Sequence, residues 1–365
     1  MQKKPKKVKL ILLKSIWKHL TVRRRKQLII LPILITLAGL SEVFSIASLI
    51  PFLGSLSNQE KNYNSPLFKG IYERFEIFQG IDPFIFFISL FLFFITSSAL
   101  LKLLTILCSN YFAAAIGSDF SSKAYRLSLY QPYEIHIKRN SSEIISSILL
   151  NAERTVTIIE SILQLLVSVF IGIALISSLF FINWFLSILI SLVFLSLYLL
   201  IGLFLKKRIK KIGKNKADLT IMQTKALQEG LGSIRDIILD NNQNYFLNIF
   251  SSTDSKLRFM AAKSDFIPQS PKYIFEIFTL STITIFAFIL NRISGSGSNI
   301  IPILGPIIFG IQRLLPSFQL SYNSWVTITV NINSVNNFLD LLDQTLENKK
   351  YNHKIEFKQT INLKN

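Results

Sequence analysis

The chain has 365 residues, of which 50% are hydrophobic and only 17% are charged, and its formal net charge is +19. Soluble domains carry about 25% charged residues, so this composition indicates a membrane protein. The Lys and Arg residues flank apolar stretches instead of sharing a face with aromatic residues, which argues against nucleic acid and indicates positive-inside topology with attraction to anionic lipid. One cysteine, Cys108, and three scattered histidines exclude a disulfide framework and a metal site.

Residues 1–26 are rich in Lys and Arg and contain no acidic residue, which predicts a basic cytosolic N-terminal segment. The apolar stretch from Gln27 to Leu53 is too long for the core of a signal peptide and lacks a cleavage site, so we expect it to be the first span. Residues 55–82 are polar with balanced charges and predict an external loop. The second span begins at Pro83, runs to about Cys108 and continues as a polar helix towards Tyr130.

The segment from Gln131 to Glu143 contains a proline and an Asn-Ser-Ser capping signal, which predict a short cytosolic connector. No charged residue stands between Ser161 and Leu205. That stretch is long enough for two spans of about 20 residues each, with a turn at residues 183–184. The basic residues that begin at Lys206 mark the return to the cytosol.

A fifth span is expected after Pro268 and Pro271, ending at Leu290, and a sixth begins near Ile300. The external turns carry few basic residues, whereas every cytosolic segment is basic. The predicted fold class is therefore an all-α membrane protein, with six long helices within residues 27–345 and both termini in the cytosol. Its predicted location is the cell (inner) membrane.

A polar stretch without proline runs from Lys206 to Ile267, between long apolar segments. Apolar residues recur in it at three- to five-residue intervals, which predicts one helix from Lys206 to Ile238, roughly 50 Å long at 1.5 Å per residue. Spans two and three, and spans four and five, then form two extended hairpins. Their tips, residues 132–142 and about 239–249, are suited to receiving force from a partner; the alternative is a soluble vestibule without a partner.

Ionisable residues inside spans are rare and usually face a bundle interior or a watery cavity. Lys102 and Glu160 lie near the cytosolic ends of their spans and are expected to reach the interface. Arg313 is expected roughly 20 Å inward from the external side, and Glu276 roughly 12 Å from the cytosolic side. Because the hydrocarbon core is about 30 Å thick, the two residues lie at similar depths. Three interpretations of Arg313 are open. It forms an ion pair with Glu276, it caps carbonyls freed by Pro316, or it faces a cavity and binds an anionic head group. Glu42 is a further candidate for that cavity.

Several short motifs follow one another in an order that resembles the transmembrane domain of ABC exporters of the six-helix (type IV) group. They are ALQEGLGSIRDI from Ala226 with Tyr245, Phe246 and Phe250, QPYE from Gln131 with NSSE from Asn140, FINW from Phe181, and QRLLP from Gln312. After them, KIEFK from Lys354 with INLKN from Ile361 resembles the first strand of the attached nucleotide-binding domain. The QRLLP motif is most similar to members that flip lipid-linked oligosaccharides or export glycolipids.

The resemblance implies that the hairpin tips are coupling helices that dock on nucleotide-binding domains. The contact residues would be Tyr133, Glu134 and His136 in the first tip, and Asn242, Tyr245 and Phe246 in the second. It also implies that two subunits pair as a homodimer, with spans four and five crossing to the partner. The expected function is alternating-access export of a lipid, a lipid-linked oligosaccharide or a polysaccharide precursor, with Arg313, Glu276 and Glu42 at the substrate cavity.

By the same resemblance, residues 346–365 look like the start of a nucleotide-binding domain that is otherwise missing. The sequence contains no G-x-x-x-x-G-K-[ST] phosphate loop and no other catalytic motif. We therefore expect no cofactor in this chain, and ATP with Mg on a nucleotide-binding domain that is truncated, split off or encoded separately.

Two other classes of function stay open. A membrane enzyme of lipid-linked sugar metabolism would need clustered carboxylates or histidines near one interface. The acidic residues of the first external loop are too widely spaced for such a pair: Glu60, Glu73, Glu76 and Asp82. An ATP-independent carrier would be favoured by inverted repeats or broken helices, and the two halves of the sequence show no convincing similarity.

Overall fold

The computed structural model describes residues 8–57, 83–138, 141–182, 184–294 and 301–345, and every regular element in these ranges is a helix. The all-α fold class is thus confirmed for the described part of the chain. Most of the expected first external loop, residues 58–82, lies outside it. So do residues 346–365, where a nucleotide-binding domain was expected to begin.

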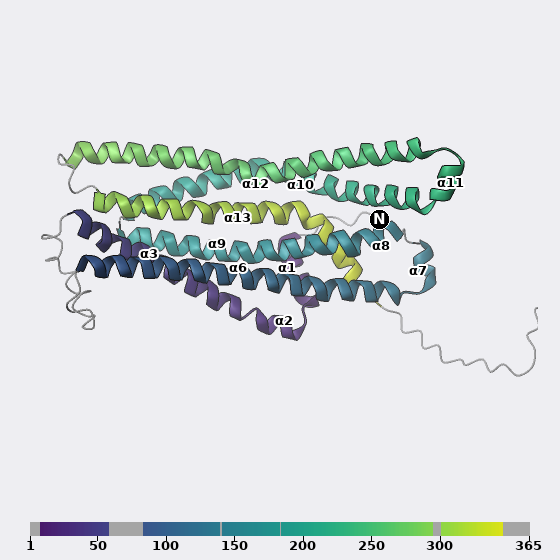
Figure 1. Cartoon of the computed structure of the whole chain (residues 1–365), viewed down its shortest axis with the longest axis horizontal. Helices are drawn as coiled ribbons and strands as arrows, with labels where there is room; N and C mark the ends of the chain where they lie inside the picture. The colour runs from purple at the N-terminus through teal and green to yellow at the C-terminus, as the bar shows by residue number, and fades with distance from the viewer. Residues whose placement is uncertain (1–7, 58–82, 139–140, 183, 295–300, 346–365) are drawn as a thin grey trace, which may run out of the picture.

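Six long helices lie roughly side by side along the long axis of the molecule (Figure 1). They are α3 (Ile30–Ser57), α6 (Pro83–Leu129), α9 (Ala152–Ile182), α10 (Trp184–Gly232), α12 (Gln243–Ser294) and α13 (Ile301–Leu342). The short elements are α1 (Val8–His19), α2 (Val22–Gln27), α7 (Tyr133–Lys138), α8 (Ser141–Ser146), the π-helical turn η2 (Ser147–Asn151) and α11 (Ile234–Leu239).

The longest helices among the described residues are much longer than a bilayer is thick. α6, α10 and α12 have 47, 49 and 52 residues. At 1.5 Å per residue each reaches about 70 Å or more, against a hydrocarbon core of about 30 Å. The two long hairpins expected from the sequence are therefore present, α6 with α9 and α10 with α12.

Among the described residues, three stretches are long and apolar enough to cross a membrane by length and composition: Val22–Leu53, Phe84–Leu129 and Glu143–Phe181. The apolar side chains of α6 are largely on its outer surface, as a lipid environment requires. Those exposed over its first half include Leu92, Phe93, Leu100, Leu103, Leu104 and Leu107. The chain is a membrane protein on these grounds, and the number of six spans stays a prediction.

The expected single helix from Lys206 to Ile238 is wrong in its last turns. α10 ends at Gly232, and Ser233 has φ −109° and ψ 28°, outside the helical region, before α11 begins. Glycine and serine both weaken a helix, because glycine loses the most backbone entropy and serine competes for backbone hydrogen bonds. The helical hairpin therefore closes with a short separate helix instead of one unbroken rod.

The second tip is also shorter than the irregular segment expected at about residues 239–249. The amide of Asn242 donates to the carbonyl of Ile237 at 3.0 Å, and Asn241 has φ 53°. Asparagine tolerates this left-handed conformation better than most residues. The chain consequently reverses within three residues, and α12 begins at Gln243. α12 then continues without a break through Pro268 and Pro271.

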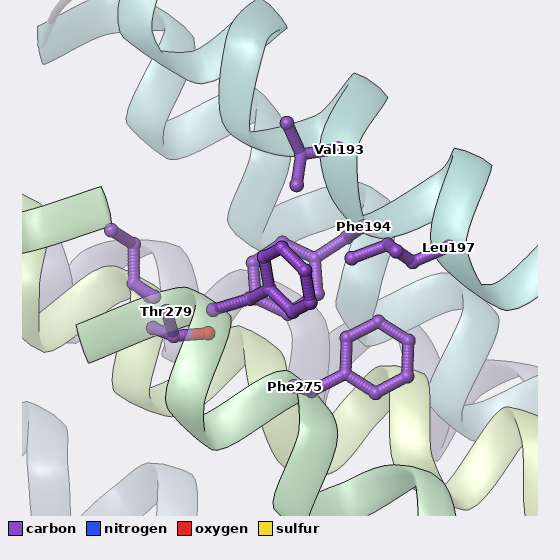
Figure 2. A pocket seen from close by; sticks show the side chains of 7 residues that line it. Val193, Phe194, Leu197, Phe275 and Thr279 are labelled. Carbon is purple, nitrogen blue, oxygen red and sulfur yellow. The ribbon is translucent and has the colours of Figure 1, made fainter. Parts of the chain in front are cut away.

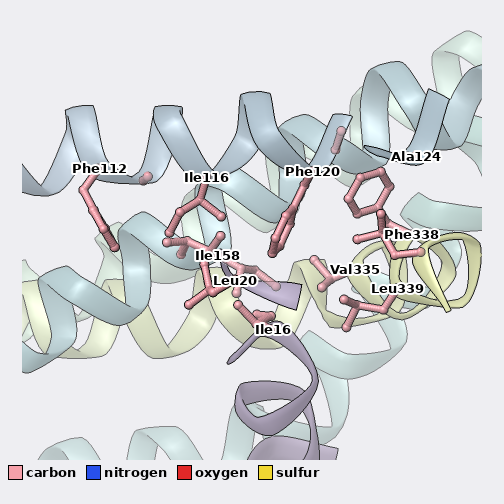
Figure 3. Close-up of a cluster of buried hydrophobic side chains, with 14 of the residues drawn as sticks. Ile16, Leu20, Phe112, Ile116, Phe120, Ala124, Ile158, Val335, Phe338 and Leu339 are labelled. Atoms are coloured by element: carbon pink, nitrogen blue, oxygen red, sulfur yellow. The ribbon is translucent and has the colours of Figure 1, made fainter. Parts of the chain in front are cut away.

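The largest buried apolar cluster among the described residues joins α1 to α3, α6, α9 and α13, and Figure 3 shows part of it. Ile16 of α1 and the adjacent Leu20 meet Phe120 of α6, Ile158 of α9 and Phe338 of α13. Phe120 and Phe338 are 2% and 0% exposed. Burying an aromatic side chain of this size away from water stabilises a fold by roughly 1.5–3 kcal/mol. The end of α1 and the adjacent Leu20 are thus packed against the long helices.

A second cluster holds the α10–α12 hairpin against the rest. The rings of Phe194 and Phe275 stack with centroids 5.7 Å apart, and Tyr198 stacks on Phe275 at 3.8 Å. Figure 2 shows the small cavity beside them, of about 10 Å³, between Val193 and Leu197 on α10 and Thr279 on α12. A cavity of this size has room for about one water molecule at most, so it is a packing defect and no substrate site.

Glycines bring the long helices close together. A side chain at Gly213 of α10 would collide with the backbone carbonyl of Val330 on α13, and one at Gly310 of α13 would collide with Leu179 on α9. Small residues allow this kind of approach between membrane helices. α13 is itself continuous across Pro306 and Pro316. Gly213 and Gly310 therefore have a packing role between the helices.

Polar contacts fasten α1 to the end of α13. The ring of His19 is 5% exposed and lies between Lys123 and Asp343: Nδ1 is 3.0 Å from the Lys123 ammonium, and Nε2 is 3.2 Å from Asp343 Oδ1. Lys18 contacts the same carboxylate at 2.9 Å. A neutral imidazole satisfies both neighbours, because Nδ1 accepts from Lys123 while Nε2–H donates to Asp343.

Burial and the nearby Lys123 charge lower the pKa of His19 from its ordinary 6.5, although Asp343 opposes them. As the pH falls through 6.5, the unfolded chain takes up the proton first, so stability falls. The bond from Lys18 lowers the pKa of Asp343 from its ordinary 3.8, and that contribution is lost only at still lower pH. Between about pH 8 and about pH 5, His19 therefore determines the pH dependence of this contact.

We expect the thermal stability of the wild-type chain in detergent to fall more steeply over this range than that of His19→Gln. Glutamine keeps one acceptor and one donor but does not titrate. The control is His136→Gln, because His136 is exposed on α7. Equal slopes for the wild type and His19→Gln would contradict the assignment of a buried neutral imidazole.

Candidate functional site

A carboxylate with two cationic partners lies at the centre of the first apolar helices. Glu42 of α3 is 0% exposed, and its Oε1 is 2.8 Å from the ammonium of Lys102 on α6. Its Oε2 is 2.7 Å from Nη1 of Arg313 on α13 and also accepts a hydrogen bond from the hydroxyl of Ser98. One buried side chain thus ties three helices together, and each of its oxygen atoms has a charged donor.

Arg313 is held from two further sides. Its Nη1 donates to the hydroxyl of Ser45 at 3.1 Å, and its guanidinium lies over the ring of Phe309, 4.7 Å from the centroid. The side chains of Arg313 and Lys102 are still 18% and 35% exposed. Two cations share one carboxylate, so the Glu42 cluster has one excess positive charge with accessible N–H donors. Such a cluster can attract an anion, because a guanidinium binds carboxylate and phosphate through several N–H groups.

The structure brings Arg313 and Glu42 together but leaves Glu276 apart. Glu276 is exposed on α12, and Arg313 pairs with Glu42 instead. Similar depth was the only ground for pairing Glu276 with Arg313, and depth does not give the rotation of a helix about its axis. Lys102, which the sequence placed at the interface, is the second partner of Glu42. Ser98 and Lys102 are four residues apart and hence on one face of α6. This spacing was the signal in the sequence that the two side chains could share a partner.

Both hairpin tips lie at the same end of the bundle, where Figure 1 shows α7 and α11. Tyr133, Glu134 and His136 are exposed on α7, with Tyr133 at 77%. In the other tip, Asn242 is exposed in the turn and Tyr245 is 62% exposed in the first turn of α12. Phe246 is only partly buried, beside Gly230.

Ile237 anchors α11 because it is buried, whereas its neighbours point outwards. The exposed apolar residues around the two tips are Leu129, Tyr130, Tyr133 and Ile137, and Leu231, Ile234, Ile238, Leu239, Tyr245 and Leu247. Exposed apolar patches of this kind are typical of interaction surfaces. These two sets of residues are called the tip surfaces below.

A polar cavity that the sequence did not reveal lies between α9, α10, α12 and α13. It has a volume of about 370 Å³, and Arg154, Lys216, Asp265 and Asn331 help to line it. The Arg154 guanidinium donates to Ser334 and Thr220, each at 2.8 Å. Burial lowers the pKa of Lys216, and the nearby Asp265 opposes this effect. The cavity contains acids as well as bases, so its charge is close to balanced.

Replacing Glu42 with Gln should destabilise the protein by about 3–5 kcal/mol, because it leaves two neighbouring cations without their shared counter-charge. The double variant Glu42→Gln/Arg313→Gln should recover part of the lost stability. The free energy of unfolding of each variant is measured in mixed micelles.

Glu229→Gln is the matched control, since Glu229 forms an exposed pair with Lys225 at 3.6 Å. Exposed pairs of this kind contribute about 0–1 kcal/mol. A Glu42→Gln variant as stable as Glu229→Gln would show that Glu42 is not a buried counter-ion.

The sequence matches the family of the ABC transporter transmembrane region over residues 28–291. No curated protein matches the chain. The matched range begins just before α3 and ends within α12, so it covers five of the six long helices, both tips and two of the three helices that meet at Glu42. The chain therefore belongs to the ABC transporter transmembrane region family.

Proposed function

We propose that this chain, the permease part of an ABC transporter, is the membrane half of an exporter that moves a lipid across the bilayer by alternating access. The cargo is a lipid, a lipid-linked oligosaccharide or a polysaccharide precursor with an anionic head group. Two copies act together as a homodimer, and nucleotide-binding domains that hold ATP and Mg supply the energy. The observation that carries the proposal is the pair of tip surfaces at one end of the bundle.

The tip surfaces support a docking role because their apolar side chains are far from the membrane-spanning parts of the helices. Transmembrane domains of this family typically partner with a nucleotide-binding domain. A short helix at the end of a hairpin such as α10–α12 transmits a displacement well, because both arms are continuous helices of about fifty residues. Movement of α11 at one end therefore tilts the arms within the bilayer.

The Glu42 cluster supports an anionic cargo. Its excess positive charge lies on helices that pack together at membrane depth, where an unpaired charge is costly. A phosphate or carboxylate head group would supply the missing counter-charge by binding the exposed edges of Arg313 and Lys102. The apolar outer surface of α6 is compatible with a cargo whose tail stays in lipid.

The docking proposal predicts photo-crosslinks at the tips. With p-benzoylphenylalanine in place of Tyr133 or Tyr245, irradiation in cells should give an adduct with a protein that contains a phosphate loop. The same group in place of Tyr111 should give none, because Tyr111 is 73% exposed on α6 but lies about five helical turns before the first tip. The adducts are identified by mass spectrometry.

An ATP-binding protein attached only through the tip positions, whose ATPase activity depends on this chain, supports the proposal. Adducts with lipid at the tip positions, or equal adducts at all three positions, would contradict it.

The cargo proposal predicts that Arg313→Ala lowers ATP-dependent flipping of an anionic lipid in proteoliposomes by at least tenfold, while Arg313→Lys retains part of it. Expression should survive Arg313→Ala, because Lys102 and Ser98 still satisfy Glu42. Arg258→Ala is the control: Arg258 pairs with Asp254 on the exposed face of α12. Unchanged flipping by Arg313→Ala would refute the anionic cargo but leave the docking proposal intact.

A further inference from the structure

Two cationic side chains from different helices line the polar cavity between α9, α10, α12 and α13. Arg154 lies in the first turn of α9, and Lys216 lies in the second half of α10. The cavity volume of about 370 Å³ falls within the range of about 300–1,000 Å³ that is usual for sites of small ligands. The cavity can therefore hold a small molecule as well as a single ion.

Hydrogen bonds bring the two cations to neighbouring positions on α10. The Arg154 guanidinium donates to the hydroxyl of Thr220 at 2.8 Å, and the same hydroxyl donates to the backbone carbonyl of Lys216 at 2.7 Å. Residues four apart on a helix are neighbours on one face. The Arg154 guanidinium thus reaches α10 one turn from Lys216, and two positive charges border one cavity.

Neither cation forms an ion pair with a carboxylate of the described residues. Hydroxyls of Ser334 and Thr220 hold the Arg154 guanidinium. The Lys216 ammonium donates to the hydroxyl of Ser264 at 3.3 Å. In the Glu42 cluster, by contrast, two cations share one carboxylate. A hydroxyl does not neutralise its partner, and a charge that is partly removed from water without a counter-charge is costly. The cavity therefore favours an anion.

The two acidic residues of the cavity are placed differently from its cations. Glu153 and Asp265 are exposed, whereas Arg154 and Lys216 are half-buried. Asp265 is linked to Lys216 through the hydroxyl of Ser264, which donates to the carboxylate at 3.2 Å. Water and salt weaken the effect of exposed carboxylates, so they neutralise the cations only in part. They also disfavour a large polyanion, which would lie close to them, and leave a compact anion as the best fit.

Phosphate is the compact anion that suits two cations of these kinds. It carries up to two negative charges and several acceptor oxygens. A guanidinium binds phosphate through several N–H groups, and a lysine ammonium binds it as a point charge. Further polar groups of the lining belong to Thr157, Thr327 and Asn331. A carboxylate ligand would carry a single charge and leave one of the two cations without compensation.

Two features of the surroundings agree with a binding role. The π-helical turn η2 directly precedes α9, and its Leu150 lines the cavity. Turns of this kind occur frequently at functional sites. In addition, Lys216 follows Lys206, where the basic residues of α10 begin, and lies roughly 15 Å further from the apolar stretch along the axis. A phosphate can therefore reach the cavity from water.

We infer that this cavity binds a phosphate group, with its oxygens on the Arg154 guanidinium and the Lys216 ammonium. The group belongs to a soluble phosphate or to a lipid head group that leaves the membrane surface, and the test separates these two sources. The cavity shares no residue with the Glu42 cluster or with the tip surfaces. The inference therefore goes beyond the proposed function and does not depend on the cargo.

The test measures binding of radiolabelled inorganic phosphate to the full chain in micelles of an uncharged detergent. Equilibrium dialysis gives the affinity, with the ionic strength held constant by chloride. Phosphate should bind saturably, and it should raise the thermal stability because it binds the folded chain. Arg154→Gln and Lys216→Gln should each weaken binding about tenfold or more, because each removes a charge-assisted hydrogen-bond donor.

Lys225→Gln is the matched control. It also removes one positive charge from α10, but Lys225 lies outside the cavity in an exposed pair with Glu229. This variant should bind phosphate like the wild type. Thr327→Phe tests the cavity without removing a charge, since the larger side chain fills space beside the cations, and it should weaken binding as well. It keeps the inference testable even where Arg154→Gln does not fold.

Equal binding by Lys216→Gln and Lys225→Gln, or no binding of inorganic phosphate to the wild type, would overturn the inference. Binding that is lost in Arg313→Ala but kept in Lys216→Gln would assign the anion to the Glu42 cluster and overturn it too. That result would leave the proposed anionic cargo intact.

Mixed micelles with phosphatidic acid separate the two sources, because its head group is a phosphate monoester. Displacement of labelled phosphate by phosphatidic acid, but not by phosphatidylcholine, supports the inference and identifies a lipid head group as the ligand. Displacement by neither lipid, with binding of inorganic phosphate unchanged, supports it with a soluble phosphate as the ligand.

Discussion

A helix of about fifty residues cannot be buried in a bilayer whose core takes about twenty. α6, α10 and α12 are of that length, so more than half of each must continue into water. Inside hydrocarbon an unbroken helix is favoured because no water is available for backbone groups. Outside it, the helices persist only because side chains pack between them, as Phe120 and Phe338 do. The positions of the tips and of the Glu42 cluster depend on these helices, which continue without a break from the hydrocarbon core into water.

The charged groups of the structure divide along the same boundary. In the bundle, Glu42 is fully enclosed by donors, and the cations beside it keep only a part of their surface open. Towards the tips, pairs such as Arg258 with Asp254 lie on the surface, where water weakens them. The polar cavity at Arg154 is intermediate, since hydroxyls instead of carboxylates hold its guanidinium. Electrostatic interactions are therefore strongest inside the bundle, where the side chains are shielded from water.

Composition and periodicity were sufficient for the long helices, because apolar stretches and their basic flanks report directly on the solvent around each segment. The helix boundaries at Ile182 and Trp184 and the first tip after Pro132 were predictable for the same reason. The break at Ser233 was not, since Gly232 and Ser233 are also tolerated within helices. The partner of Arg313 depends on how α3, α6 and α13 rotate about their axes, which one sequence does not give. The cavity that Arg154 and Lys216 share becomes visible only once four helices are assembled.

The attachment of α1 to α13 has a consequence for biosynthesis. Ile16 and Leu20 precede Phe338, which shares their cluster, by more than 300 residues of the chain. Until α13 is made, this side of α1 can pack only against residues of earlier helices such as Phe120 and Ile158, and its lysines favour a position near anionic lipid. The packing of α1 can therefore be completed only after Phe338 and its neighbours on α13 have been made.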